Sequence, residues 1–75
     1  MVKALILVSI EPNETAQVFD DIKGMAHITE ALQTYGEYDA AFVIETEHVG
    51  GIQDFVKAVR KIKGITRTIT LIEVA

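Results

Sequence analysis

The segment from Val2 to Ile10 constrains the fold of this chain more than any other. Its even-numbered side chains are apolar, and the odd-numbered Leu5 and Leu7 are apolar too. A strand that carries apolar side chains on both of its faces is covered on both faces. We therefore predict that this segment is a central strand of a sheet, with a packing layer on either side.

The elements after this strand are predicted from apolar periodicity and from turn-forming residues. In chain order they are a helix capped by Asn13 and ended by Gly24, strands over His27 to Tyr35 and Ala40 to Thr46, a helix over Val49 to Lys63 ended by Gly64, and a strand over Ile65 to Val74. The order βαββαβ is that of the ferredoxin-like fold. It predicts an α+β protein with a four-stranded antiparallel sheet and two helices on one face. Right-handed crossovers place the first and third strands in the middle and the second and fourth at the edges.

Two helices cover only one face of such a sheet, yet the central strands carry apolar side chains on both faces. Because a chain of 75 residues is only marginally stable alone, oligomerisation is expected. We predict that a second copy packs on the other face across a two-fold axis, which gives a dimeric α/β barrel. The alternative is an open, solvated sheet with a few exposed apolar side chains.

Composition limits the partners of a single domain spanning residues 1–75. A net charge of −4 and a sequence pI near 4.9 argue against a nucleic-acid surface. The basic residues Lys57, Arg60, Lys61 and Lys63 are interpreted as a solvated helix end where positive charge complements the helix dipole. Zero cysteines and the absence of a long apolar run or a signal peptide predict a cytoplasmic protein without a membrane segment.

Metal binding and catalysis find little support in the sequence. A metal site would need His27 and His48 to meet among carboxylates, but one begins an edge strand and the other precedes a helix. Ser9 lies inside a strand, with no serine-histidine-acid arrangement around it. The glycine pair Gly50-Gly51 lacks the pattern of a phosphate-binding loop. We predict no metal, no cofactor and no catalytic residue.

The turn Gly36-Glu37-Tyr38-Asp39 contains the remaining candidates for a functional site. A polar hairpin that needs glycine for positive φ explains Gly36 and tolerates Asp39. It does not require Tyr35 and Tyr38 on either side of the glycine. Two aromatic rings can wall a pocket in which Asp39 meets a ligand ammonium group and backbone N–H groups meet a carboxylate. From the residues alone, a ligand site and a plain hairpin are equally supported.

Three features together resemble a known family. They are the turn Gly36-Glu37-Tyr38-Asp39, the helix residues Ile52 and Phe55, and the segment from Gly64 to Ile72. Over essentially the whole chain they look like the C-terminal effector domain of Lrp/AsnC transcription regulators, known as the RAM domain, for regulation of amino acid metabolism. The resemblance implies a homodimer formed through the sheets, a ring of such dimers, and a small amino acid bound between dimers near the turn.

The resemblance also implies a set of ligand-binding residues in the turn and the last strand: Tyr35, Gly36, Glu37, Tyr38, Asp39, Thr66, Arg67, Thr68 and Thr70. Full-length members carry an N-terminal helix-turn-helix, but here the first strand begins at Val2. We therefore expect no DNA-binding domain and no direct contact with nucleic acid. The expected protein is a non-enzymatic amino-acid sensor that works alone or co-assembles with full-length Lrp/AsnC regulators.

Two alternatives stay open. A small dimeric α/β-barrel enzyme of the monooxygenase or isomerase type shares this topology, and it would require His27 or His48 deep in a pocket beside a carboxylate. A purely structural oligomerisation domain without a ligand is the other, and it would leave the Gly36 turn fully exposed in the assembled protein.

Overall fold

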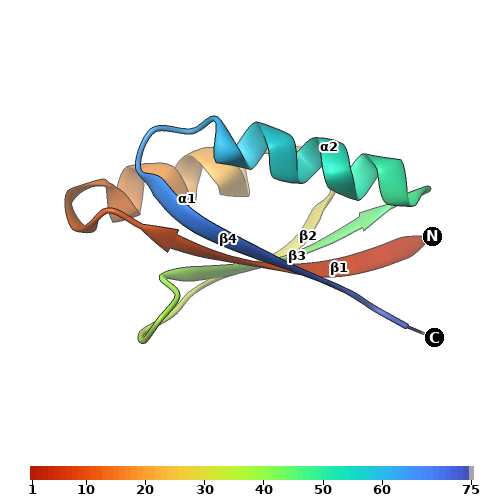
Figure 1. The fold of residues 1–75 in the computed structure, drawn as a ribbon, viewed down its shortest axis with the longest axis horizontal. Helices are drawn as coiled ribbons and strands as arrows, with labels where there is room; N and C mark the ends of the chain where they lie inside the picture. The colour runs from red at the N-terminus through yellow and green to blue at the C-terminus, as the bar shows by residue number, and fades with distance from the viewer. Residues whose placement is uncertain (75) are drawn as a thin grey trace.

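A computed structural model describes residues 1–74 of the chain. Its elements in chain order are β1 (Val2–Ile10), the 3-10 turn η1 (Pro12–Glu14), α1 (Thr15–Lys23), β2 (Ile28–Gln33), β3 (Ala40–Thr46), α2 (Val49–Arg60) and β4 (Ile65–Ile72). Both helices lie on the same side of a twisted sheet, and the other side of the sheet is bare (Figure 1). The predicted βαββαβ fold, with its two helices on one face, is confirmed.

The strands lie in the order β2-β3-β1-β4, and every neighbouring pair is antiparallel. As predicted, β1 and β3 are central while β2 and β4 form the edges. The register places Leu7 opposite Ala41 of β3 on one side and opposite Ile69 of β4 on the other. The alternation of β1 therefore sets which side chains of its neighbours face the helices.

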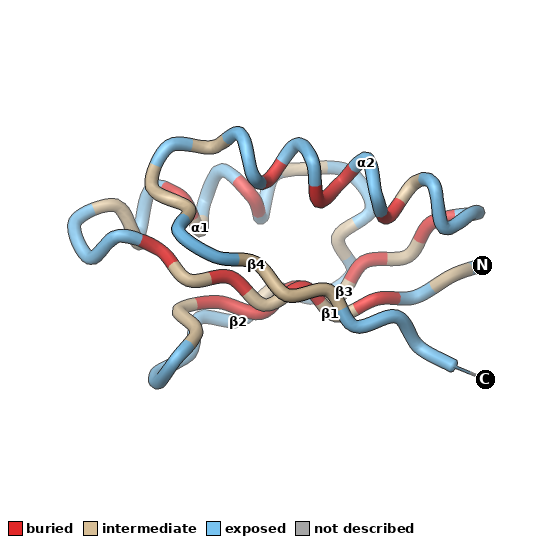
Figure 2. The backbone as a smooth tube through the Cα atoms, in the orientation of Figure 1, coloured by how far each residue is buried: buried red, intermediate tan, exposed pale blue. Residues whose placement is uncertain are grey.

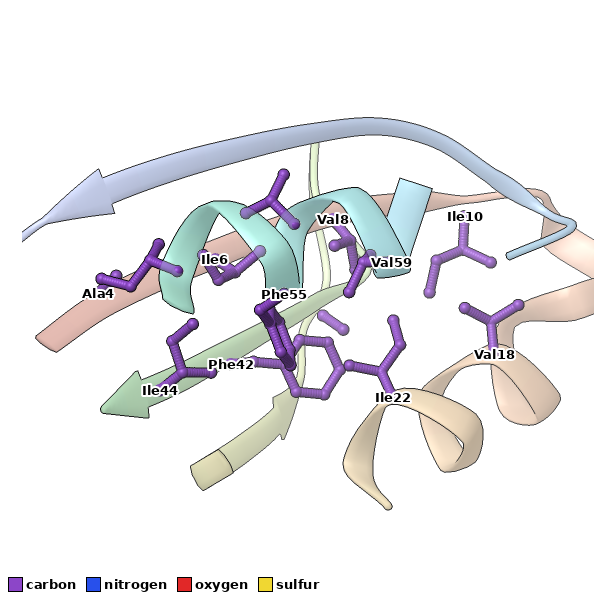
Figure 3. Close-up of a cluster of buried hydrophobic side chains, with 13 residues drawn as sticks. Ala4, Ile6, Val8, Ile10, Val18, Ile22, Phe42, Ile44, Phe55 and Val59 are labelled. Atoms are coloured by element: carbon purple, nitrogen blue, oxygen red, sulfur yellow. The ribbon is translucent and has the colours of Figure 1, made fainter. Parts of the chain in front are cut away.

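The core lies between the sheet and the two helices. The even-numbered side chains of β1 and β3 point into it, and Ile6, Val8 and Phe42 have no exposed surface. Figure 3 shows Phe42 among side chains from the strands and from both helices, including Ile22 of α1 and Val59 of α2. Burying each such side chain contributes about 1.5–3 kcal/mol. The core therefore depends on the tertiary arrangement of all the elements.

The helix bounds differ from those predicted. Asn13 does not cap α1, because Pro12 starts a 3-10 turn before it, and the N-cap of α1 is Glu14 without a side-chain hydrogen bond. Proline is favoured at the first position of a helical turn, since its φ is already fixed there. The second helix ends at Arg60 rather than at Lys63, because the N–H group of Lys61 bonds to the carbonyl three residues back and tightens the last turn.

The strand bounds also differ, whereas the end of α1 agrees with the prediction. Gly24 is the C-cap of α1, as expected. The second strand stops at Gln33 and the last at Ile72, each two residues before the predicted end. The connection between β2 and β3 is therefore longer than a four-residue turn. No helix within residues 1–74 is long and apolar enough to cross a membrane.

Gly64 joins α2 to β4 under tight steric limits. It has φ +103°, and an added Cβ would lie 2.9 Å from the Cβ of Glu14 and 3.2 Å from Val18. We expect Gly64→Ala to lower the free energy of unfolding by about 1–3 kcal/mol, through backbone strain and overpacking. Urea denaturation measures this loss. As a control, Gly50→Ala meets nothing within 4 Å, so it should raise stability by about 0.5–1 kcal/mol. Equal effects of the two changes would contradict the steric account.

The face of the sheet opposite the helices carries two rows of mostly apolar side chains. The odd-numbered residues of β1 point to this side and are half-buried or exposed (Figure 2). One row is Leu32, Ala41, Leu7 and Ile69, and the next is Glu30, Val43, Leu5 and Leu71. We call this surface the open face. Within residues 1–74 nothing covers it, and the predicted dimer through it remains a prediction.

Candidate functional site

The loop between β2 and β3, residues 34–39, is fastened to itself and to the end of β1. Within the loop, the N–H group of Thr34 donates to the carbonyl of Asp39 at 3.0 Å, and the Thr34 hydroxyl donates to the carbonyl of Tyr38 at 2.7 Å. The Ser9 hydroxyl of β1 donates to the carbonyl of Glu37 at 2.9 Å. These bonds hold the loop in one place although most of its side chains are exposed.

Asp39 makes the strongest attachment of this loop. Its N–H group donates to the carbonyl of Val8 at 2.8 Å, and its Oδ2 accepts a 2.7 Å hydrogen bond from the N–H group of Ile10. A hydrogen bond to a carboxylate is about twice as strong as one between neutral groups. Asp39 therefore has a structural role, because it satisfies a β1 backbone donor that lies beyond the β3 pairing.

A cleft of about 520 Å³ opens where this loop faces the start of α1. Its lining residues come from β1, the β1–α1 connection, β2 and the loop: Ile10, Pro12, Thr15, Gln33, Thr34, Tyr35 and Asp39. Tyr35 is completely exposed, so its ring stands at the rim and does not fill the cleft. The lining combines a carboxylate, hydroxyl and amide groups with the apolar side chains of Ile10 and Pro12, which suits a small polar ligand.

A second group of side chains from the same loop meets β4 on the other side of the sheet. The guanidinium carbon of Arg67 lies 5.0 Å from the centre of the Tyr38 ring, and its Nη2 donates to the Tyr38 hydroxyl at 2.9 Å. Glu37 lies 3.9 Å from the same nitrogen, and both charged side chains are largely exposed. Because Arg67 is paired with Ser9 of β1, this group belongs to the open face.

The structure divides the predicted site residues among several places. Tyr35 and Asp39 line the cleft, whereas Glu37, Tyr38 and Arg67 meet on the open face. Gly36 is at the loop tip with φ +121° and no atom near its would-be Cβ, as expected of a turn glycine. Two threonines of β4, Thr66 and Thr68, line a separate hollow of about 340 Å³ together with Arg67, whereas Thr70 faces the groove along α2. Thr66 also donates to the carbonyl of Ser9, and Thr68 accepts from Arg60. One chain does not bring the whole set together.

Five residues of the cleft were not predicted from the sequence. Gln33 and Thr34 directly precede Tyr35, whereas Ile10, Pro12 and Thr15 come from a segment distant in the chain. Strand and helix periodicity carry no information on which loops meet at one end of a sheet. Thr34 could have been identified from the local sequence, because threonine hydroxyls commonly bond backbone groups in turns. Here the Thr34 hydroxyl donates to the carbonyl of Tyr38.

The enzyme alternative requires a histidine deep in a pocket beside a carboxylate, and neither histidine lies in such a place. His27 and His48 are exposed and line none of the clefts described for residues 1–74. Within the same residues no group of three or more histidine, aspartate or glutamate side chains could hold a metal ion.

The fold and this loop define a class of small regulatory ligand-binding domains. The chain belongs to the Lrp/AsnC ligand binding domain family, whose description matches residues 3–74. The resemblance to the RAM domain is thus confirmed, and it covers nearly the whole chain. No curated protein sequence matches the chain.

Solved structures support the same assignment. The crystal structure of FFRP-DM1 has a TM-score of 0.92 and 31% sequence identity, and the match covers 99% of this chain and 100% of that one. The hypothetical protein PHS023 from Pyrococcus horikoshii has a TM-score of 0.89 and 30% identity, with 100% and 92% covered. The transcriptional regulator NMB0573 from Neisseria meningitidis, solved in complex with L-Met, has a TM-score of 0.85 and 16% identity, with 99% and 50% covered. The last shows the fold alone.

Proposed function

We propose that this protein is a cytoplasmic, non-enzymatic sensor that binds a small amino acid, or a related metabolite, beside the β2–β3 loop. The observation that carries the proposal is the cleft of about 520 Å³ that Asp39 and Tyr35 line. Asp39 meets the α-ammonium group of the ligand, and the side-chain amide of Gln33, which lines the same cleft, donates to its carboxylate. Membership of a ligand-binding family supports this assignment.

Two further observations support the choice of an amino acid. The regulator from Neisseria meningitidis shares this fold and was solved with L-Met. In the present chain, Asp39 uses one carboxylate oxygen for the N–H group of Ile10, which fixes the orientation of the other. A charged ligand binds more tightly to a group that is already oriented, because less conformational entropy is lost on binding.

We further propose that the ligand-bound protein is an oligomer. The apolar rows of the open face would be covered by a second copy, and Tyr38 and Arg67 would then lie at the rim of that contact. Dimers would assemble into a ring that completes the ligand site, alone or together with full-length Lrp/AsnC regulators. Residues 1–74 themselves contain no helix-turn-helix.

Isothermal titration calorimetry with the twenty amino acids tests the proposal. We expect heat from at least one of them with the wild-type protein. Asp39→Asn should then weaken binding about 10–100-fold, since it removes the charge that meets the ligand ammonium. It keeps an oxygen that can accept the Ile10 bond, so the fold should be retained.

Asp39→Ala serves as the matched comparison. It removes both the charge and the acceptor for Ile10, so it should also lower the free energy of unfolding by about 1–3 kcal/mol. Binding that survives Asp39→Asn but fails in Asp39→Ala would assign Asp39 a structural role only. The absence of heat with every amino acid, in a correctly assembled wild-type sample, would refute the proposed ligand class.

A further inference from the structure

The two threonine hydroxyls in the cleft between the β2–β3 loop and the start of α1 already donate their protons to the backbone. Thr34 donates to the carbonyl of Tyr38 at 2.7 Å. Thr15 donates to the carbonyls of Glu11 and Pro12 at 3.4 and 3.3 Å. A hydroxyl group has a single proton but also lone pairs that accept hydrogen bonds. Toward a ligand, both threonines therefore act as acceptors.

Asp39 adds another acceptor to the same wall of the cleft. Its Oδ2 accepts a 2.7 Å hydrogen bond from the N–H group of Ile10, and its Oδ1 is left for a ligand. Of the described residues that line the cleft, Asp39 alone is charged. Gln33 contributes a side-chain amide, whose N–H groups meet the ligand carboxylate in the proposed function, and the exposed Tyr35 stands at the rim. Once the ligand carboxylate is bound, the rest of this wall presents acceptors.

Such a wall fits a ligand side chain that only donates hydrogen bonds. The ammonium group of lysine and the guanidinium group of arginine carry several N–H donors and no acceptor. The amide of asparagine or glutamine also brings a carbonyl oxygen, and an acidic side chain brings a carboxylate. Each of those oxygens would need a donor that the described wall does not offer, and an unpaired polar group costs binding free energy.

The balance of charge in the cleft leads to the same choice. An amino acid with an apolar side chain is a neutral zwitterion, so its complex with the cleft keeps the negative charge of Asp39 uncompensated. A basic amino acid carries a net positive charge at neutral pH, which the carboxylate of Asp39 balances. The net charge of −4 on the whole chain also favours the approach of a cation.

We propose, resting on the proposed function, that the ligand is a basic amino acid of the lysine, ornithine or arginine type. Its α-ammonium group binds Asp39 and its carboxylate binds Gln33. The side-chain cation donates to the hydroxyl oxygens of Thr15 and Thr34, and the methylene groups before it cover the apolar part of the lining. The cleft of about 520 Å³ has the size of a small-molecule pocket, about 300–1,000 Å³.

A second copy of the chain does not alter this choice. Neighbouring subunits of the proposed ring would add groups to the side of the ligand that faces away from this wall. Whatever a neighbour supplies, the part of the ligand that touches Thr15 and Thr34 meets acceptor oxygens. The selection of a donor-only side chain is therefore a property of each chain.

Two ligands that differ in one group test the inference on the intact wild-type protein. Norleucine is lysine without the terminal ammonium group, and the two share the apolar stem, the α-ammonium group and the carboxylate. In isothermal titration calorimetry we expect lysine to bind at least about tenfold more tightly, because charge-assisted hydrogen bonds are the strong ones. Glutamate should bind at least about tenfold more weakly than lysine. Nε-acetyllysine keeps the length but loses the charge, so it should also bind more weakly than lysine.

Two variants locate the side-chain cation. Thr15→Val keeps the shape of the side chain and removes the acceptor oxygen, so it should weaken lysine binding at least about threefold and leave norleucine binding unchanged. Gln33→Met should weaken both ligands by the same factor, because both carry the carboxylate that Gln33 meets. Thr15 is half-buried and Gln33 is exposed, so both variants should fold, as checked by circular dichroism.

Each contrary outcome has a distinct meaning. Norleucine binding as tight as that of lysine, in the wild-type protein, would overturn the inference and leave the proposed amino-acid function in place. An unchanged ratio of lysine to norleucine affinity in Thr15→Val would place the side-chain cation elsewhere and overturn the inference as well. The absence of heat with every amino acid would refute the proposed function, and the choice of a basic ligand with it.

Discussion

Replacing Phe42 with alanine is expected to lower the free energy of unfolding by about 3–5 kcal/mol. The ring has no exposed surface and packs between the sheet and both helices, 5.6 Å from the ring of Phe19 between their centres. A small domain has only about 5–15 kcal/mol of stability in all. The variant should therefore be largely unfolded at moderate urea concentrations where the wild type is folded, as followed by circular dichroism.

Tyr35→Ala provides the matched control for this truncation. It also removes an aromatic ring, but that ring is completely exposed, so the change in stability should stay within about 0.5 kcal/mol. Both variants are compared at one protein concentration, since association of the folded state adds to apparent stability. A loss below about 1 kcal/mol for Phe42→Ala would contradict its place at the centre of the core.

The fold could be predicted because the pattern of apolar side chains along a strand shows which of its faces are covered, and this limits the position of the strand in the sheet. The two apolar faces of β1 required a central position, and the sheet order confirms it. The ends of elements were less predictable. Pro12 starts a 3-10 turn where Asn13 was expected to cap α1, so α1 begins later, and the last turn of α2 tightens before the glycine at position 64. Each end depends on a balance of a few hydrogen bonds, which periodicity does not resolve.

The candidate site was predictable in part, for a different reason. The loop around Gly36 was identified from residue types, and Gly36 does have positive φ. The bond from Ile10 to Asp39 spans 29 positions, and nothing in either local sequence indicates it. Adjacent residues of the loop also lie on different sides of the sheet. Asp39 lines the cleft, and the Tyr38 ring packs against Arg67 on the open face. A list of residue types cannot show that division.

Replacing Leu7 with aspartate is expected to convert the proposed dimer into a monomer. Leu7 lies in the middle of an apolar row on the open face, between Ala41 and Ile69. In the dimer the new carboxylate would be buried without a partner, which costs about 3–5 kcal/mol and raises the dissociation constant by more than about 100-fold. Sedimentation-equilibrium ultracentrifugation over a concentration series measures this change.

Ala16→Asp, on the exposed side of α1, adds the same charge away from the open face and should leave the association constant unchanged. Circular dichroism should show folded protein for both variants. A Leu7→Asp protein that still dimerises with unchanged affinity would place the contact on another surface.

If the dimer does form through the open face, Tyr38, which contacts Arg67 at its rim, shares a loop with Asp39 at the cleft. Ligand affinity should then fall in the Leu7→Asp monomer, because two equilibria that share a structural element are thermodynamically coupled.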